Sequence, residues 1–459
     1  MKEVCFVKIS DIKPAPYNPR KISDEQAAVL RESFKKIGFV VPIIINKKNN
    51  VIIAGHQRSN NAKKIGIDSV PAFYVDDISV GDEIRFNQMH NGVETKDLDG
   101  VTVDATGYQE EQFITIPCNE FNADMKSLKM TLVKEICKLI IKYGNVMSAV
   151  ICKNTVLFAR EYVYACKLIN QPVNCYICDD GKYEDILKYF CQDYGVYSYD
   201  NIERNTFVQG LAQLNRSVVK QDGKKAMHST LYVNMVIPYL SKHKAQSILD
   251  FGCGKGAYIT ALAKQYDAVG LEFFNNDRKH IDIAKGHTMI DALIHHLAEK
   301  GKFDIVVCDS VLNSVDSVEA EKSVMTCLNL FARDTVFISG RPREQAEKKL
   351  DYSTHKNALK NDVYYLDDNG FTATYREGKW FFQKFHTEEQ VIQLAADNGF
   401  DIEEIVFNQS TFRCRLRKVR ELSVEEYIKA VDFEFNLPLP NGKSYNRQDD
   451  MKKVLGLEL

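Results

Sequence analysis

The sequence lacks three features that would mark a strongly charged, membrane or secreted protein. It has no charge excess, since 60 Lys and Arg stand against 62 Asp and Glu, so a nucleic-acid or lipid partner would need a local patch. It has no run of about 18 apolar residues, the length that a membrane-spanning helix requires. Its start, MKEVCFVKISDIK, has neither the basic head nor the apolar stretch of a secretory signal. We therefore expect a cytoplasmic protein with no membrane partner.

The 12 cysteines lack the spacing of a disulfide framework or a metal site. They lie inside strand-like or helix-like runs, which is typical of reduced, buried thiols. Cys175 and Cys178 form the single C-x-x-C pair, and no second Cys/His pair stands at ligand spacing. We predict no bound metal.

The chain contains an internal repeat. At 459 residues it is long enough for roughly three domains of about 150 residues. The stretch from Gly38 to Asp77, which includes VVPIIINKKNNVIIAGHQR, matches the stretch from Gly144 to Asp180, which includes VMSAVICKNTVLFAREY. We interpret these as two copies of one small α/β module, at 1–95 and 110–200. The second copy has AREY in place of AGHQR, so it binds a ligand differently or not at all.

A third unit follows a predicted helical linker at 201–244. Between 245 and 420, strands alternate with helices, which indicates βαβ units and a parallel sheet covered on both faces. This unit ends in an antiparallel pair of strands, and residues 421–459 form a C-terminal extension. The fold class is therefore α/β, with two small modules before a Rossmann-like sheet.

The first strand of this unit leads into a glycine-rich turn, LDFGCGKG. Asp250 ends the strand, and Gly252, Gly254 and Gly256 occupy the turn, where a backbone that approaches a ligand has no room for Cβ atoms. Glu272 ends the next strand and can bind ribose hydroxyls. The spacing of the glycines differs from that of dinucleotide-binding Rossmann domains.

The region 245–420 resembles the class I S-adenosylmethionine-dependent methyltransferases, including their final antiparallel hairpin. The resemblance implies that the glycine turn lies along the methionine end of the cofactor and that Glu272 binds its ribose. It also implies that Phe273 or Phe274 packs on adenine. Only about 31 residues separate Glu272 from the fourth strand of that family's pattern, so we expect a shortened or missing helix and a more open adenine side.

The methyl acceptor is decided after the strand FDIVVCDS. Enzymes that methylate exocyclic amines of DNA bases carry a D/N/S-P-P-aromatic tetrapeptide here, whereas this chain has Asp309-Ser310-Val311-Leu312. Cys308 lacks the preceding proline of the cytosine-C5 enzymes, and we interpret it as a core thiol. The candidates for contact with the acceptor are Asp309, Asn313, Arg341 and His386. The competing interpretations are that Asn313 caps the helix starting near Val318 and that His386 is the N-terminal flank of a helix at 387–398.

The loop AGHQR in the first module has the features of an anion site. Gly55, His56, Gln57 and Arg58 lie between a strand and a helix, where helix-terminal amides and a guanidinium suit a phosphate. Arg20, in PYNPR, adds a second guanidinium. Residues 5–80 closely resemble the N-terminal domain of the ParB and sulfiredoxin superfamily, in which this box binds nucleotide phosphates. The sulfiredoxin members of the superfamily need a cysteine in this box. This chain has none there, so we do not expect it to reduce sulfinic acids.

These patterns support two hypotheses of different classes. In the first, the chain is a methyltransferase in nucleic-acid or nucleotide-related modification, of a phage or mobile element. Its ParB-like module then binds DNA or a nucleotide such as CTP or ATP with Mg²⁺, and a homodimer is an allowed assembly. In the second, the chain is a ParB-like nucleotide-dependent DNA-binding protein whose methyltransferase fold only senses S-adenosylmethionine. A nucleotide-dependent kinase or nuclease is a third interpretation, for which no acidic metal cluster is evident near the box.

Overall fold

The computed structural model describes residues 2–18, 20–92, 100–123, 128, 130–190, 196–199, 202–206, 218–221, 224–243, 247–276, 280–350, 366–376 and 378–457. The chain forms two compact units. The first comprises Met1–Ile202 with Glu347–Asp368, and the second Glu203–Ala346 with Asn369–Leu459. None of the helices in these described ranges is both long and apolar enough to cross a lipid bilayer.

The first unit begins with a four-stranded module of strand order β1-β5-β3-β4. In it, β5 runs parallel to β3, while β1 and β4 are antiparallel to their neighbours. Five isoleucine and valine residues of the two central strands are almost fully buried and form the core of this module: Ile43, Ile44, Ile45, Val70 and Val75. Its elements are β1 (Cys5–Lys8), β2 (Arg20–Lys21), α1 (Asp24–Ile37), β3 (Ile43–Asn46), β4 (Val51–Ala54), α2 (His56–Lys64), β5 (Ser69–Val75) and α3 (Val80–Gly92).

The second module repeats this arrangement. Its sheet has the order β7-β11-β9-β10-β6-β8, in which the first four strands pair in the same directions as β1-β5-β3-β4. Side chains of both modules, including Phe86 of the first and Leu132 of the second, share one hydrophobic cluster. Its elements are β6 (Val101–Val103), β7 (Gln112–Ile116), β8 (Phe121–Ala123), α4 (Met130–Tyr143), β9 (Ala149–Cys152), β10 (Thr155–Phe158), α5 (Arg160–Leu168) and β11 (Val173–Ile177).

The second unit is built on a six-stranded sheet of order β16-β15-β17-β18-β22-β21. The first four strands are parallel, and β22 and β21 add an antiparallel end. This is the Rossmann-like α/β sheet with a final hairpin that the sequence predicts. The strands are β15 (Ser247–Phe251), β16 (Asp267–Leu271), β17 (Phe303–Cys308), β18 (Ala332–Gly340), β21 (Phe400–Phe407) and β22 (Phe412–Lys418).

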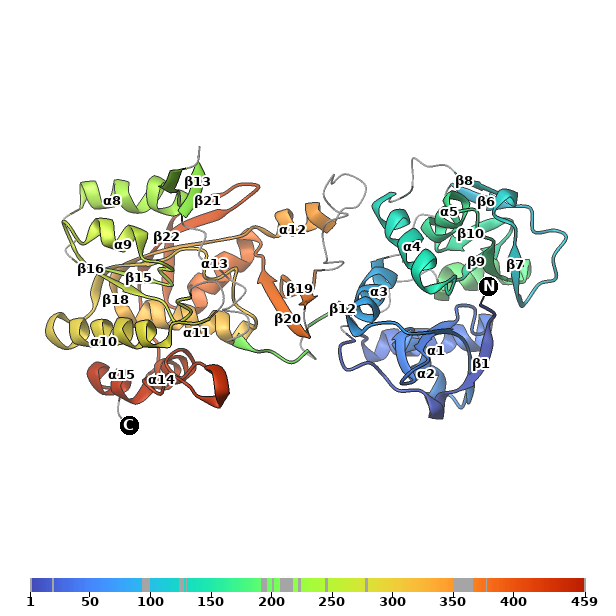
Figure 1. Cartoon of the computed structure of the whole chain (residues 1–459), viewed down its shortest axis with the longest axis horizontal. Helices are drawn as coiled ribbons and strands as arrows, with labels where there is room; N and C mark the ends of the chain where they lie inside the picture. The colour runs from blue at the N-terminus through green and yellow to red at the C-terminus, as the bar shows by residue number, and fades with distance from the viewer. Residues whose placement is uncertain are drawn as a thin grey trace. The chain divides into compact units, whose positions relative to one another are not determined.

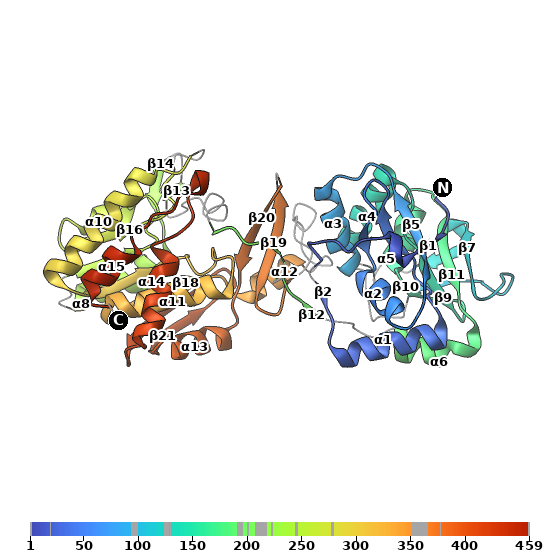
Figure 2. The same cartoon turned by 90° about the horizontal axis from the view of Figure 1, so that it is seen from below.

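Helices cover this sheet on both faces. In Figure 1, α8 and α9 lie on one side of it and α10 and α11 on the other, with α14 and α15 outside them; Figure 2 shows α14 and α15 from that outer side. A separate hairpin of β19 (Phe371–Arg376) and β20 (Lys379–Lys384) precedes α13. The helices are α8 (Ile237–Lys242), α9 (Ala257–Leu262), α10 (Ile283–Lys300), α11 (Val318–Phe331), α12 (Arg343–Leu350), α13 (Glu388–Asp397), α14 (Val424–Glu434) and α15 (Gln448–Leu455).

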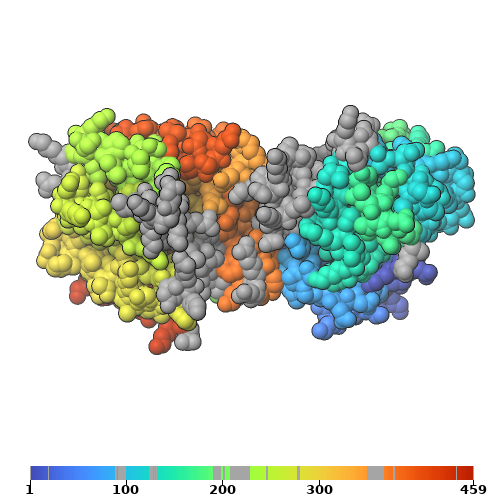
Figure 3. All heavy atoms as spheres, turned by 45° about the horizontal axis from the view of Figure 1, so that its top comes forward, coloured from blue at the N-terminus to red at the C-terminus, as the bar shows by residue number. Residues whose placement is uncertain are grey.

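The segment expected to be a helical linker is only partly helical. A helical turn at Tyr232–Val236 leads into α8, but β13 (Val218–Gln221) and β14 (Lys224–Met227) form a hairpin. The helical part packs on the six-stranded sheet of the second unit, where the Arg415 guanidinium of β22 lies 5.4 Å from the centre of the Tyr239 ring. Figure 3 shows the yellow-green surface of this segment beside the orange-red surface of β21 and β22.

Candidate functional site

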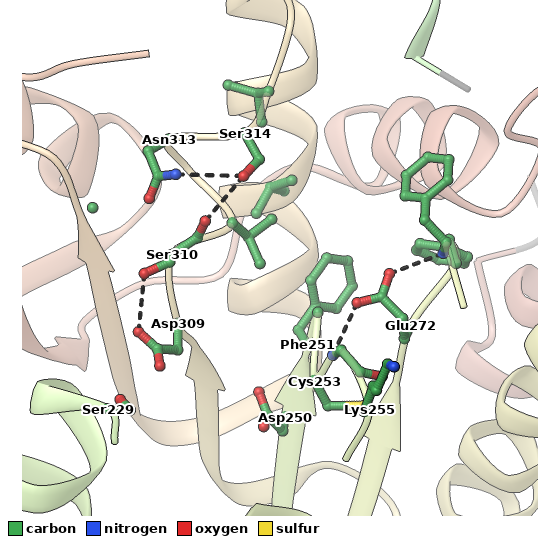
Figure 4. A pocket seen from close by; sticks show the side chains of 18 of the residues that line it. Ser229, Asp250, Phe251, Cys253, Lys255, Glu272, Asp309, Ser310, Asn313 and Ser314 are labelled. Carbon is green, nitrogen blue, oxygen red and sulfur yellow. Dashed lines mark hydrogen bonds between the residues drawn. The ribbon is translucent and has the colours of Figure 1, made fainter. Parts of the chain in front are cut away.

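The second unit contains a cavity of ≈ 680 Å³ at the carboxyl ends of its parallel strands. Residues at the ends of β15, β16, β17 and β18 all line it. Open α/β sheets bind ligands at this edge, because the loops there diverge to helices on opposite faces. Figure 4 shows Asp250, Glu272 and Asp309 projecting into the cavity from three neighbouring strands.

The turn after β15 has the backbone geometry that demands glycine. Gly252, Gly254 and Gly256 have φ of 85°, 58° and 71°, a region that other residues rarely adopt. A Cβ atom on Gly252 would lie 2.2 Å from Cγ2 of Val311. The backbone at Gly252 therefore packs on Val311, in the cavity wall, more closely than a residue with a side chain would permit.

The carboxylate of Glu272 is fixed by this turn. Its Oε2 accepts a hydrogen bond from the Gly254 amide at 2.9 Å, and its Oε1 accepts one from the Phe274 amide at 2.8 Å. Burial raises the pKa of Glu272, while these two bonds act in the opposite direction. The adjacent Phe273 is buried and packs on Phe251 with ring centroids 6.1 Å apart, whereas Phe274 is half-buried at the cavity wall.

Asp250 is a buried carboxyl with an unpartnered oxygen. Its Oδ2 accepts a hydrogen bond from the Tyr232 hydroxyl at 2.7 Å, but its Oδ1 has no partner within the described chain. Burial raises the pKa of Asp250 to about 7, and the charges of Asp309 and Glu272 add to this effect. Tyr232 stacks on Tyr258 at 4.0 Å, which holds the phenol at the strand end.

The opposite end of the cavity presents acceptor oxygens. Asp309 Oδ1 accepts a hydrogen bond from Ser339 Oγ at 2.5 Å. Asn313 is 6% exposed, lines the cavity, and has an Oδ1 atom without a partner among the described residues. The cap of α11 is Ser317, whose side chain accepts from the Ala320 amide. Helix capping therefore does not explain Asn313.

Arg341 and His386 differ in their relation to the cavity. Arg341 lines it, and its Nη1 donates to Gln383 Oε1 at 3.2 Å. His386 is absent from the lining and is 1% exposed, with Nε2 2.5 Å from Glu321 Oε1. Its backbone amide donates to the Arg341 carbonyl at 2.9 Å, so His386 supports Arg341 from behind.

Cys308 lies in the core, as expected for a structural thiol. It is fully buried in β17, and burial raises its pKa well above the usual range. Such a thiol is a poor nucleophile.

Sequence reasoning missed two groups that line the cavity. Ser229, Thr230 and Tyr232 come from the segment interpreted as a linker, and Phe433 and Glu434 from the C-terminal extension. Neither group carries a motif. The run YVNMVIPYL is a signal that could have attached the linker to the sheet, because its apolar residues recur at helical spacing.

The first unit gathers the residues of the AGHQR loop at the start of α2. Gly55 has φ 98°, and a Cβ atom there would lie 2.6 Å from Ile43 Cγ2. Gln57 Nε2 donates to the Arg20 carbonyl at 2.8 Å, and Arg58 Nη1 donates to the Val41 carbonyl at 2.7 Å. The loop and the segment that holds Arg20 are therefore joined directly.

His56 and His90 are interior residues of this cluster. His56 is 4% exposed, and its Nε2 accepts a hydrogen bond from the Ala15 amide at 3.0 Å. Burial lowers the pKa of His56 to about 3, so it is neutral at pH 7. Burial also lowers the pKa of His90 to about 3, with the nearby charges of Arg58 and Arg20 contributing. Both guanidiniums therefore act on His90, while His56 holds the Pro-rich segment through the Ala15 amide.

The second module keeps the backbone conformation of this loop, but a buried side chain of the module occupies the position of Arg58. Ala159 takes the position of Gly55 and also has positive φ, 62°. Tyr162 stands where the first copy has Arg58, and its hydroxyl donates to Asn145 Oδ1 at 2.7 Å. A buried tyrosine thus replaces the guanidinium. The described residues contain no group of three or more His, Cys, Asp or Glu side chains that could hold a metal ion.

Comparisons with known proteins give separate matches for the N-terminal and C-terminal parts of the chain. The family model of the ParB N-terminal domain matches residues 1–91, and that of a methyltransferase domain matches residues 230–405. The chain is 38% identical over 69 residues to the ParB-like nuclease domain-containing protein YnaK of Escherichia coli, covering 15% of this chain and 78% of that protein. It is 45% identical over 69 residues to stage 0 sporulation protein J of Bacillus subtilis, covering 14% of this chain and 24% of that protein.

The chain thus spans about a quarter of sporulation protein J, and 27% of a probable chromosome-partitioning protein ParB from Campylobacter jejuni. Among solved structures, an S-adenosylmethionine-dependent methyltransferase from Clostridium acetobutylicum is similar at 10% identity and TM-score 0.31, over 42% of this chain and 93% of that one. Residues 230–405 match the family model of a methyltransferase domain, and through residues 1–91 the chain belongs to the family of the ParB N-terminal domain.

Proposed function

We propose that the second unit transfers a methyl group from S-adenosylmethionine to a nucleic-acid or nucleotide-derived acceptor, and that the ParB-like module binds DNA or a nucleotide. The observation that carries the first part is the cavity at the strand ends, where the glycine turn meets Glu272. Arg58 in the first turn of α2, and Arg20 in the segment that Gln57 joins to this turn, support the second part.

The cavity suits the proposed cofactor. The turn at Gly252 and Gly254 lines the cavity and can lie along its amino-acid end, and the unpartnered Oδ1 of Asp250 can accept from its ammonium group. Glu272 stands at the end of the adjacent strand to receive the ribose hydroxyls. When bound, S-adenosylmethionine supplies a methyl group on a positively charged sulfur.

The residues at the other end of the cavity then act on the acceptor. Asp309 and Asn313 accept hydrogen bonds from its N–H or O–H group, which aims the lone pair of the nucleophilic atom. Asp309 can also receive the proton that this atom releases after methylation. Arg341 can neutralise a phosphate or carboxylate of the acceptor. His386 acts through Arg341 as a positioning residue.

Calorimetry with S-adenosylhomocysteine tests the cofactor site. We expect binding by the wild-type protein and none by Gly254→Asp, because the new carboxylate would occupy the turn next to Glu272. Nucleotide binding by the first unit should remain, which controls for folding. Binding by Gly254→Asp at wild-type affinity would contradict the assignment.

Incubation with methyl-labelled S-adenosylmethionine tests the acceptor. We expect label in digests of DNA or in nucleotides. Cofactor binding without transfer to DNA, nucleotides or small molecules, together with CTP or ATP turnover, would instead favour a cofactor-sensing DNA-binding protein. Sedimentation of the same samples measures whether the protein is a homodimer.

A further inference from the structure

The C-terminal extension forms one wall of the cavity. Phe433 and Glu434, at the end of α14, line it together with Leu437. This wall lies beside the end of β16, because the ring of Phe435 is 5.4 Å from that of Phe273. The hydroxyl of Tyr445 also donates to the Phe273 carbonyl.

This wall covers the edge of the sheet beside β16, which the described core of the unit leaves without a further strand. The described residues between Glu272 and β17 contain α10 and no strand. The sequence predicts an open adenine side for this reason, but α14 packs on α11, α15 packs on α10, and the edge is covered (Figure 2). Gly286 of α10 lies against Tyr445, because a Cβ atom on this residue would come within 2.4 Å of the Tyr445 hydroxyl oxygen. The extension and α10 therefore fit closely.

Glu434 is the polar group of this wall. It is 5% exposed, it lines the cavity, and its carboxyl makes no hydrogen bond with the described part of the chain. Burial raises the pKa of Glu434 to about 8, and the charge of Asp316 adds to the effect. At pH 7 the side chain is therefore mostly a neutral carboxylic acid, with one O–H donor and one carbonyl acceptor.

This pair of groups complements one edge of adenine. The exocyclic N6 amino group of adenine donates, and the ring nitrogens N1 and N7 that flank it accept. A neutral carboxylic acid can satisfy both groups at once, whereas an ionised carboxylate can satisfy only the amino group. Phe433 and Leu437 beside Glu434 provide apolar surface for the ring.

We propose that the C-terminal extension forms the adenine pocket of the methyltransferase cavity and that Glu434 recognises the amino edge of the base. This inference rests on the proposed function, because it assumes that S-adenosylmethionine is the ligand. It assigns a cofactor-recognition role to a segment that has no motif and lies outside the matched methyltransferase domain of residues 230–405.

Calorimetry with two ligands tests the contact. The first is S-adenosylhomocysteine, and the second is its purine analogue, which lacks the exocyclic amino group. We expect wild-type protein to bind the first about tenfold to hundredfold more tightly, since a buried polar group left unpaired costs about 1–3 kcal/mol. Glu434→Leu should bind both ligands about equally. Glu434→Gln, which keeps a donor and an acceptor, should retain the preference.

The matched control is Glu425→Leu, an exposed acidic residue on the same helix, which should behave as wild type. Thermal melting of each variant verifies folding. If wild-type protein binds S-adenosylhomocysteine and Glu434→Leu keeps the full preference over the purine analogue, the inference is overturned and the proposed function stands. If the wild-type protein binds neither ligand, both are overturned.

Discussion

At the scale of single residues, the cavity is defined by carboxyl groups in unequal environments. Asp250 and Glu434 are buried groups whose pKa values are raised to about 7 and about 8. Glu272 instead accepts hydrogen bonds from two backbone amides. A carboxyl group whose pKa lies near 7 can lose its proton when a charged ligand binds, because a nearby cation favours the ionised form.

Asp250 leads to a prediction about pH. Since its pKa in the folded protein is raised to about 7, the proton is bound below that pH and must leave when a cationic ligand pairs with the carboxylate. Affinity for S-adenosylmethionine should therefore fall as pH drops below about 7, by up to about tenfold per pH unit. Calorimetry across pH 5.5–8.5, a range chosen to span about 7, measures this slope.

The same shift has a consequence for stability without ligand. A carboxyl with a raised pKa favours the folded state when protonated, so this contribution is lost as pH rises through about 7. Asp250→Asn should flatten both the affinity profile and this part of the stability profile. Asp334→Asn, an exposed residue at the start of β18, is the matched control. An unchanged pH profile in Asp250→Asn would exclude this titration.

At the scale of elements, the β19–β20 hairpin is anchored beside the acceptor end of the cavity. The Lys384 amide donates to the Asn313 carbonyl at 3.2 Å. The Lys384 ammonium lies 3.5 Å from Glu321 Oε2, on the far side of the carboxylate that His386 contacts. Burial tends to raise the pKa of Glu321, but the bond and charge of His386 and the charge of Lys384 hold it below its usual range.

Glu321→Gln should weaken this anchor. Removing one partner of a buried ion pair costs about 3–5 kcal/mol, because the other charge stays buried. We expect a lower free energy of unfolding by denaturant and a reduced methyl-transfer rate, with the affinity for S-adenosylhomocysteine unchanged. Glu319→Gln, exposed on the same helix, should change neither. A loss of cofactor affinity in Glu321→Gln would show that the cluster supports the whole cavity instead.

At the scale of the whole molecule, two candidate sites lie in two compact units of one chain. The first module carries guanidiniums at a helix N-terminus, and the second unit carries a cavity with five carboxyl groups in its lining. Their charges suit an anion and a cationic cofactor respectively. Coupling between them is a measurable free energy, which must be the same whichever ligand binds first.

Arg58→Ala separates the two sites. The Arg58 guanidinium lies against Gly55 at the start of α2, so its removal should weaken binding of CTP or ATP by about tenfold or more, as the loss of a charge-assisted contact does. Lys63→Ala, an exposed lysine further along α2, controls for net charge. We expect S-adenosylhomocysteine affinity without nucleotide to be unchanged. If nucleotide alters that affinity in wild type but not in Arg58→Ala, the units are coupled.

The sequence predicted those features that depend on local pattern. Alternating strands and helices gave the α/β class, and the self-similar stretches gave the second module. Glycines 252, 254 and 256 stand where the backbone takes positive φ. Each follows from sterics or periodicity within a short segment, so a single sequence is sufficient.

Burial and long-range contact were decided only by the tertiary structure. Nothing in HQR indicates that His56 turns inward to accept from Ala15, 41 residues away, or that His386 contacts Glu321 behind Arg341. The extension after residue 420 has no motif, yet Glu434 reaches the cavity because α14 packs on α11. The sequence determined which segments turn, pair and repeat, because those are local preferences. Tertiary packing determined which polar groups lose water, and hence which of them can hold a ligand.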